Sequence, residues 1–155
     1  MPTPFNLSRK HVGKLSSAFA CHNLSLETPM NSEVRYPNLG IDIDGCIDES
    51  PIFFQFLSHC WKGKVYILTF RDDREKAIRD LAKFNIRYDE LILVDTFEAK
   101  AEVVARENIM IYFDDQPEMI KNMPDKVNVM LVRNGGNFCF DRNLWMMSNM
   151  TGRII

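Results

Sequence analysis

Long apolar runs are missing from this sequence of 155 residues, and their absence limits where the protein can work. No run approaches the ~20 residues that a membrane span needs, so we expect no membrane partner. Near the N-terminus, basic residues precede only the short apolar stretch 18–21, which is too brief for the core of a signal peptide. We therefore expect a cytoplasmic protein.

Basic blocks and cysteine motifs are absent as well. The formal net charge is −2, from 19 Lys and Arg against 21 Asp and Glu, so we expect no bulk binding to nucleic acid. The cysteines form neither a C-x-x-C pair nor a metal-ligand spacing, which is typical of reduced thiols in a cytosolic protein. They are Cys21, Cys46, Cys60 and Cys139.

The most informative stretch is the pattern D-x-D-G, which follows an apolar run at residues 39–41. On a continuing strand, Asp42 and Asp44 would share one face. Two carboxylates on a buried face repel each other, and a hard cation such as Mg²⁺ removes that cost. An ordinary acidic turn after a strand is the alternative interpretation of this pattern.

A second apolar run ends in acids at Asp114 and Asp115. Strands and helices alternate between the two acidic patterns. We expect strands at 39–44, 64–69, 90–94, 109–113 and 128–132, and helices from Pro51 to about Gly63 and at 72–84, 97–107 and 117–121. This alternation predicts an α/β three-layer sandwich with a central parallel sheet of about five strands, Rossmann-like, without a large cap domain. Ligands of such sheets bind outside the carboxyl ends of the strands, where the strand order reverses.

The first helix carries an apolar stripe at helical spacing, which we interpret as core rather than as a binding face. Its members are Ile52, Phe53, Phe56, Leu57, Cys60 and Trp61. Residues 1–37 are expected to form an N-terminal extension with a short helix at 8–19. Residues 38–155 would form the catalytic domain, which ends in a hairpin at 144–155.

The stretch after Gly136 is more apolar than a solvated tail should be. We expect it to pack on the sheet edge or to form a subunit contact, which leaves a homo-oligomer open.

Polar residues stand at or soon after the expected strand ends. In chain order they are Asp42 and Asp44, Thr69, Lys100, and Asp114 with Asp115. This order resembles the four motifs of the haloacid dehalogenase (HAD) superfamily of phosphohydrolases, over residues 38–133. More weakly, the D-I-D-G and F-D-D-Q-P-E stretches resemble small bacterial proteins related to the deoxyribonucleotidases.

The resemblance implies a Mg²⁺-dependent phosphatase that hydrolyses a phosphate monoester through an aspartyl-phosphate. Asp42 would be the nucleophile and Asp44 the general acid and base, while Thr69, Arg71 and Lys100 would bind the phosphate. The Mg²⁺ ligands would be Asp42, Asp44, Asp114 and Asp115. An acid at Asp44 favours phosphatase over dehalogenase chemistry.

Each of these side chains also has a purely structural interpretation. Thr69 can cap the following helix, and Lys100 can be a solvated helix residue, with Lys121 as a weaker candidate for its role. Arg71 either helps to bind substrate or pairs with one of the two aspartates that follow it. Receiver domains also use Asp, Thr and Lys, but in a different chain order, so we exclude that class.

The partner implied by the resemblance is a phosphorylated substrate, either a small molecule or a phosphate on a larger one. Because neither usual insertion point has room for a cap, we expect an open site, or one covered by a partner subunit or by residues 1–37. The alternative function is a non-catalytic or regulatory module that keeps the metal and phosphate site without useful turnover.

Overall fold

The computed structural model describes residues 35–145 of the chain. All of them belong to one compact unit, Val34–Ile155, and the expected boundary at residues 37–38 lies close to its start. The helix expected at 8–19 lies outside the described residues. Within residues 35–145, no helix is long and apolar enough to span a membrane.

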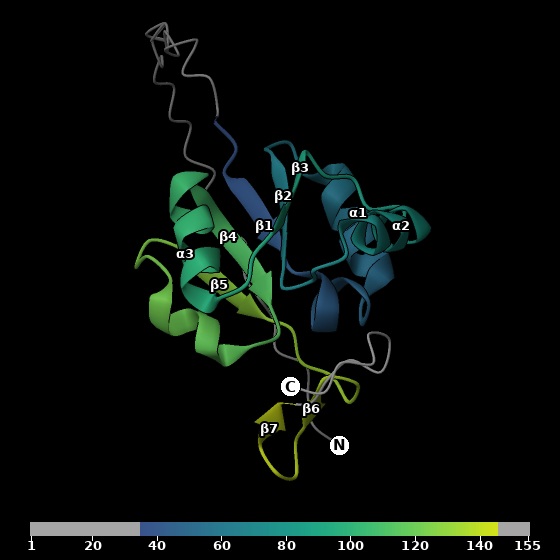
Figure 1. Ribbon diagram of the computed structural model, residues 1–155, viewed down its shortest axis with the longest axis vertical. Coiled ribbons are helices and arrows are strands. Elements are labelled where there is room, and N and C mark those ends of the chain that lie inside the picture. Colours follow the sequence, from purple (N-terminus) through teal and green to yellow (C-terminus); the bar gives the residue numbers. More distant parts are fainter. Residues whose placement is uncertain (1–34, 146–155) are drawn as a thin grey trace, which may run out of the picture. The chain divides into compact units, whose positions relative to one another are not determined.

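Five parallel strands form the central sheet, in the order β3-β2-β1-β4-β5 (Figure 1). Every strand expected for this sheet is present, with small shifts at its ends. The strands are β1 (Asn38–Ile41), β2 (Val65–Thr69), β3 (Glu90–Leu93), β4 (Ile109–Asp114) and β5 (Asn128–Leu131). Because the chain crosses from β3 back to β4 on the other side of β1, the strand order reverses between β1 and β4.

Helices cover both faces of the sheet, which confirms the three-layer α/β architecture. Helices α1 (Pro51–Cys60) and α2 (Arg74–Lys83) lie on one face, and α3 (Phe97–Arg106) and the 3₁₀ helix η2 (Pro117–Asn122) lie on the other (Figure 1). The chain fixes their starts locally. Pro51 opens α1, the carboxylate of Asp73 caps α2, and the hydroxyl of Thr96 caps α3.

Strand β2 shows how the sheet joins two separate cores. Val65 and Ile67 pack into the cluster beneath α1 and α2, whereas Tyr66 and Leu68 pack into the cluster beneath α3 and η2. All five residues of β2 are buried, as expected for a strand covered on both faces. The strand therefore holds its carboxyl end, Thr69, in a fixed position.

Strand β1 is shorter than expected. It ends at Ile41, and the amide of Asp42 donates the next hydrogen bond to the carbonyl of Phe113 at 3.0 Å. The chain then turns into η1 (Ile43–Ile47), where Gly45 adopts a φ of 82° that suits glycine. The expectation that Asp42 and Asp44 share one face of a continuing strand is therefore wrong.

The interpretation of the α1 stripe as core is wrong for most of its members. Ile52, Phe53 and Phe56 are 81%, 52% and 71% exposed, and Cys60 is exposed too. Leu57 and Trp61 of the stripe are partly buried against the core, and the half-exposed ring of Phe53 packs edge to face on Phe54 and Phe113.

The buried face of α1 is centred on Phe54 and Ser58 instead. Ser58 can be buried because its hydroxyl is satisfied: it donates to the carbonyl of Gln55 at 2.9 Å and accepts from the amide of Arg87 at 3.2 Å. Apolar residues occur on two sides of α1, and a serine marks the side that faces the sheet.

A hairpin follows the sheet, upstream of the one expected at 144–155. It pairs β6 (Phe138–Cys139) with β7 (Leu144–Trp145), and residues 146–155 of the expected hairpin lie outside the described part of the chain. Phe140 and Leu144 are 64% and 55% exposed. These two side chains therefore do not pack on the sheet edge, and the other half of the expectation, a subunit contact, stays a prediction.

Candidate functional site

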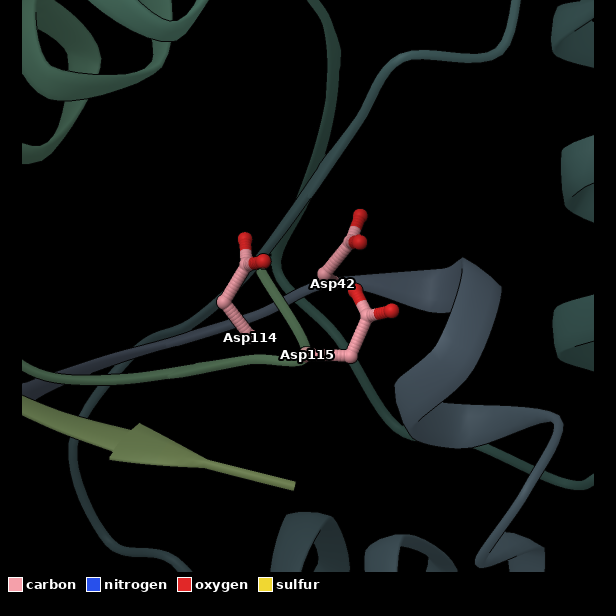
Figure 2. A group of neighbouring side chains, drawn as sticks. All are labelled: Asp42, Asp114 and Asp115. Carbon is pink, nitrogen blue, oxygen red and sulfur yellow. The ribbon is translucent and has the colours of Figure 1, made fainter. Parts of the chain in front are cut away.

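Three carboxylates converge where the strand order reverses (Figure 2). Asp42 follows β1, Asp114 ends β4, and Asp115 comes next, so neighbouring strands deliver all three to one edge of the sheet. One oxygen from each lies within 4.8 Å of the others. The exposed fractions are 3% for Asp42 and 0% for Asp114 and Asp115. This is the acidic cluster.

Lys100 is the cation that faces the acidic cluster. It comes from the first half of α3 and is fully buried. Its Nζ lies 2.8 Å from Asp114 Oδ2 and 3.2 Å from Asp42 Oδ1. Burial alone would lower the pKa of Lys100, but the charges of Asp114 and Asp42 outweigh burial and raise it, so the ammonium stays charged. The alternative candidate, Lys121, is exposed on η2.

Asp114 is held by three donors. Besides Lys100, the hydroxyl of Tyr112 donates to Asp114 Oδ2 at 3.0 Å, and the amide of Gln116 donates to Asp114 Oδ1 at 2.8 Å. Tyr112 is itself fully buried. These bonds fix the orientation of Asp114 and use much of its accepting capacity.

Asp42 is in a different electrostatic position. Burial is the main reason that its pKa is raised well above the ordinary value, and the charges of Asp114, Asp44 and Asp115 add to the effect while Lys100 partly offsets it. Its Oδ1 accepts no hydrogen bond from a described residue, although Lys100 lies within ion-pair distance. A further cation beside the carboxylate of Asp42 would favour its ionised form.

A divalent metal ion fits the acidic cluster. Oxygen donors alone are the ligand set that Mg²⁺ prefers. A buried Asp42 oxygen without a hydrogen bond and a raised pKa both call for added positive charge beyond that of Lys100. Asp42, Asp114 and Asp115 are the residues of the described part of the chain that would hold it.

Asp44 does not join the acidic cluster, because its carboxylate pairs with Arg71. Arg71 Nη2 lies 2.6 Å from Asp44 Oδ1, and Nε lies 3.0 Å from both oxygens. On its other side, Nη1 of Arg71 donates to Asp80 Oδ2 at 2.6 Å. The alternative in which Arg71 pairs with one of the two aspartates after it is thus wrong, since its partners are Asp44 and Asp80.

The two acids hold Arg71 firmly. Although burial opposes charge, the hydrogen bonds and charges of Asp44 and Asp80 raise the pKa of Arg71 above its already high value. The same guanidinium lowers the pKa of Asp80, although partial burial acts the other way. Arg71 is 7% exposed.

Thr69 lies at the carboxyl end of β2 and is fully buried. Its Oγ1 accepts a hydrogen bond from the amide of Arg71 at 3.3 Å. It does not cap α2, because Asp73 accepts the capping bond from Lys76. Because the oxygen acts as acceptor in the bond from Arg71, the hydroxyl proton of Thr69 stays available to donate.

The loop that carries Asp44 is held at Gly45. The amide of Gly45 donates to Asp48 Oδ1 at 2.7 Å, and its carbonyl accepts from Asn137 Nδ2 at 2.7 Å. A Cβ built on Gly45 would overlap Oδ2 of Asp115. The glycine thus lets the loop pass directly over the acidic cluster.

Access to the site is narrower than expected. In residues 35–145, only η1 and α1 separate β1 from β2, and only α2 separates β2 from β3, so no cap domain is present there. Even so, the acidic cluster is almost completely shielded from solvent. The protein's own loops provide that shielding: Gly45 lies against Asp115, and Gln116 against Asp114.

Sequence reasoning missed several residues that support the site. Tyr112 had a signal, since it stands two before Asp114 on the same strand and must point to the same face. Asp80 stands nine positions after Arg71, and Asn137 stands 92 positions after Gly45. Neither spacing belongs to a strand or helix period, so no local pattern could have revealed them.

No family model, curated protein or solved structure matches this chain. What the protein does must therefore follow from its own residues.

Proposed function

We propose that this chain is a Mg²⁺-dependent phosphohydrolase of the haloacid dehalogenase type, which hydrolyses a phosphate monoester through an aspartyl-phosphate at Asp42. The observation that carries the proposal is the pairing of the buried acidic cluster with Lys100 at the point where the strand order reverses. Burying three carboxylates and an ammonium together is rarely required for stability alone. Phosphoryl transfer, in contrast, uses both the negative and the positive groups.

Asp42 is the proposed nucleophile. A carboxylate oxygen of Asp42 forms a bond to phosphorus while the bond from phosphorus to the substrate oxygen breaks. Mg²⁺, held by Asp42, Asp114 and Asp115, would reduce the repulsion between the attacking carboxylate and the phosphate. Lys100 stays protonated, so it balances the negative charge of Asp42 and of the phosphoryl oxygens.

Asp44 is the proposed general acid and base. It gives a proton to the departing alcohol, and then takes a proton from the water that attacks phosphorus and releases Asp42. The products are the alcohol and inorganic phosphate. The Thr69 hydroxyl, whose oxygen accepts from the Arg71 amide, would donate to a phosphoryl oxygen.

Arg71 connects phosphate binding to the release of Asp44. Arg71 holds the carboxylate of Asp44 in an ion pair. An incoming phosphate competes for the same guanidinium, and Asp80 keeps Arg71 in place during the exchange. The carboxyl group of Asp44 is then released from Arg71 only when substrate is present.

The Asp44–Arg71 ion pair also supports the second candidate, a regulatory module that binds metal and phosphate without turnover. In such a module the pair would persist after phosphate binds, and Asp44 would transfer no proton. The two candidates differ in whether phosphate leaves the protein.

We further propose a reducing compartment, with the cytoplasm as the expected location. Its support is that Cys46, Cys60 and Cys139 are free thiols.

The test is hydrolysis of p-nitrophenyl phosphate with and without Mg²⁺, together with chemical trapping. Borohydride reduces an aspartyl-phosphate, and mass spectrometry should locate the reduced residue at position 42. Asp42→Asn should abolish turnover and trapping, whereas Asp125→Asn, a change at an exposed acid, should alter neither. A reduced residue at position 42 without release of phosphate would favour the regulatory module. Turnover by Asp42→Asn above about a tenth of the wild-type rate would refute the assignment of Asp42 as the nucleophile.

A further inference from the structure

A cavity of about 760 Å³ opens beside the acidic cluster, beyond the carboxyl ends of β2 and β3. Its volume lies within the roughly 300–1,000 Å³ range of small-molecule sites. The residues that line it come from the loops after β2, β3 and β4 and from the start of α3. They are Phe70, Arg71, Asp72, Leu93, Val94, Asp95, Thr96, Phe97 and Gln116.

Two of the lining residues also touch the site. The ring of Phe70 packs on the ammonium of Lys100, which lies 4.4 Å from the ring centroid. The backbone amide of Gln116, another lining residue, donates to Asp114 Oδ1 at 2.8 Å. Residues that line the cavity are therefore in direct contact with Lys100 and Asp114.

Arg71 is a third link. Arg71 is one of the lining residues, and its guanidinium forms the ion pair with Asp44. A phosphate that takes over this guanidinium would place the rest of its molecule at the cavity. The group that would occupy the cavity is thus the one that leaves with the ester oxygen.

The walls favour a flat, apolar group. Phe70 and Phe97 meet edge to face, with ring centroids 5.2 Å apart and an interplanar angle of 83°. Leu93 and Val94 add aliphatic surface. A third aromatic ring can join such a pair through the edge-to-face or offset contacts that aromatic groups prefer. The cavity also has polar lining residues, so the preference is assigned to the two phenylalanine rings and not to the cavity as a whole; the polar residues are Arg71, Asp72, Asp95, Thr96 and Gln116.

We infer that this cavity binds the leaving group of the substrate, and that the leaving group carries a planar aromatic ring joined to the phosphate by a short linker. Phe97 is the residue that sets this preference, because it faces the cavity without contacting Lys100 or the acids in any described interaction. The inference rests on the proposed phosphohydrolase function for the position of the phosphate.

Benzyl phosphate and cyclohexylmethyl phosphate make a matched pair for the test. Both release a primary alcohol, so the chemistry is similar, but only one ring is planar and aromatic. We expect kcat/KM to favour benzyl phosphate by about tenfold, the worth of one or two good aromatic contacts. Equal values for the two esters would overturn the inference.

Variants at Phe97 locate the preference. Phe97→Ala and Phe97→Leu should each bring the ratio of the two esters close to one, and Phe97→Leu keeps most of the volume if the alanine variant unfolds. The control is Phe56→Ala, which removes an exposed ring that lines a separate hollow on α1. A ratio unchanged in both Phe97 variants, or lost in Phe56→Ala, would contradict the assignment.

Binding of phosphonates separates this inference from the proposed function. Benzylphosphonate has a carbon–phosphorus bond and cannot be hydrolysed. In calorimetry with Mg²⁺ present, it should bind about tenfold more tightly than cyclohexylmethylphosphonate, and Phe97→Leu should remove the difference. If no ester is turned over but the phosphonates show this preference, the phosphatase proposal fails and the cavity assignment stands. If the esters are turned over without any preference in rate or binding, the phosphatase proposal stands and the cavity assignment fails.

Discussion

Replacing Lys100 with methionine would measure how strongly the site depends on its buried cation. Methionine keeps the length and the apolar stem of the side chain but removes the charge. At an effective dielectric constant of about 20, the attractions at 2.8 Å to Asp114 and 3.2 Å to Asp42 come to ~6 and ~5 kcal/mol. Much of this offsets the cost of burying the ammonium, and the usual loss when one member of a buried pair is removed is about 3–5 kcal/mol.

The assay is chemical and thermal unfolding of wild type and Lys100→Met, without and with Mg²⁺. A loss of about 3–5 kcal/mol corresponds to a melting temperature lower by about 6–20 °C for a chain of this size. Mg²⁺ should stabilise the variant more than the wild type, because the ion meets a more negative site. Each tenfold gain in Mg²⁺ affinity would add about 1.4 kcal/mol when the ion is in excess.

The pH dependence provides an internal check. Because the folded-state pKa of Asp42 is raised above its ordinary value of 3.8, folding becomes less favourable as pH rises above that value. Removing Lys100 should raise this pKa further, so the loss should be smaller in acid and grow toward neutral pH. Lys121→Met is the control, and its effect should stay within about 0.5 kcal/mol. A loss below about 1 kcal/mol in the Lys100 variant, or equal stabilisation of variant and wild type by Mg²⁺, would refute the reasoning.

Three further predictions concern the loop, the acid and the thiols. Gly45→Ala should lower the free energy of unfolding by about 1–3 kcal/mol, because φ is 82° and a Cβ would overlap the acidic cluster. It should also reduce the stabilisation by Mg²⁺ that thermal melts measure. The control is Gly135→Ala, where a Cβ meets nothing within 4 Å. Asp44→Asn should slow hydrolysis of alkyl phosphates by roughly 10²–10⁴ and of p-nitrophenyl phosphate by less, and equal losses would argue against a general acid. Cys60 is exposed and should react with a thiol reagent before Cys46 does. Burial raises the pKa of Cys46 and should delay its labelling until unfolding, as peptide mapping would show.

The sheet could be predicted because its signals are local. Each strand is a short apolar run bounded by turn residues, and the acids stand immediately after such runs, at Asp42 and Asp114. Parallel pairing then brings the two strand ends together without further information. Lys100 is buried, whereas Lys121 is exposed, so Lys100 is the stronger of the two candidate lysines for the phosphate site.

The α1 helix shows where local signals fail. Its apolar residues occur on two sides, and a helical period cannot say which side faces the sheet. The buried side contains Ser58, whose hydroxyl is satisfied by Gln55 and by the distant amide of Arg87. Only the tertiary structure supplies the second partner, so the sequence pattern favoured the wrong face.

Arg71 shows a different limit. Sequence neighbours offered two aspartates immediately after it, yet the guanidinium points back to Asp44, which is 27 positions earlier. A long side chain can reach many acids, and burial decides among them. The cost of burying the guanidinium is recovered only where two carboxylates, Asp44 and Asp80, approach it from both sides.

The anchor of the Gly45 loop has a consequence for how the chain is made. The side chain of Asn137 donates both to the carbonyl of Gly45 at 2.7 Å and to that of Val132 at 2.9 Å, so it connects the Gly45 loop to the segment after β5. Synthesis runs from the N-terminus, and the last strand of the sheet is complete at Leu131. A growing chain can therefore contain every strand of the central sheet and every acid of the cluster before the donor for Gly45 has been added. The sheet is complete first, and the loop beside Asp42 receives its second anchor only when residue 137 has joined the chain.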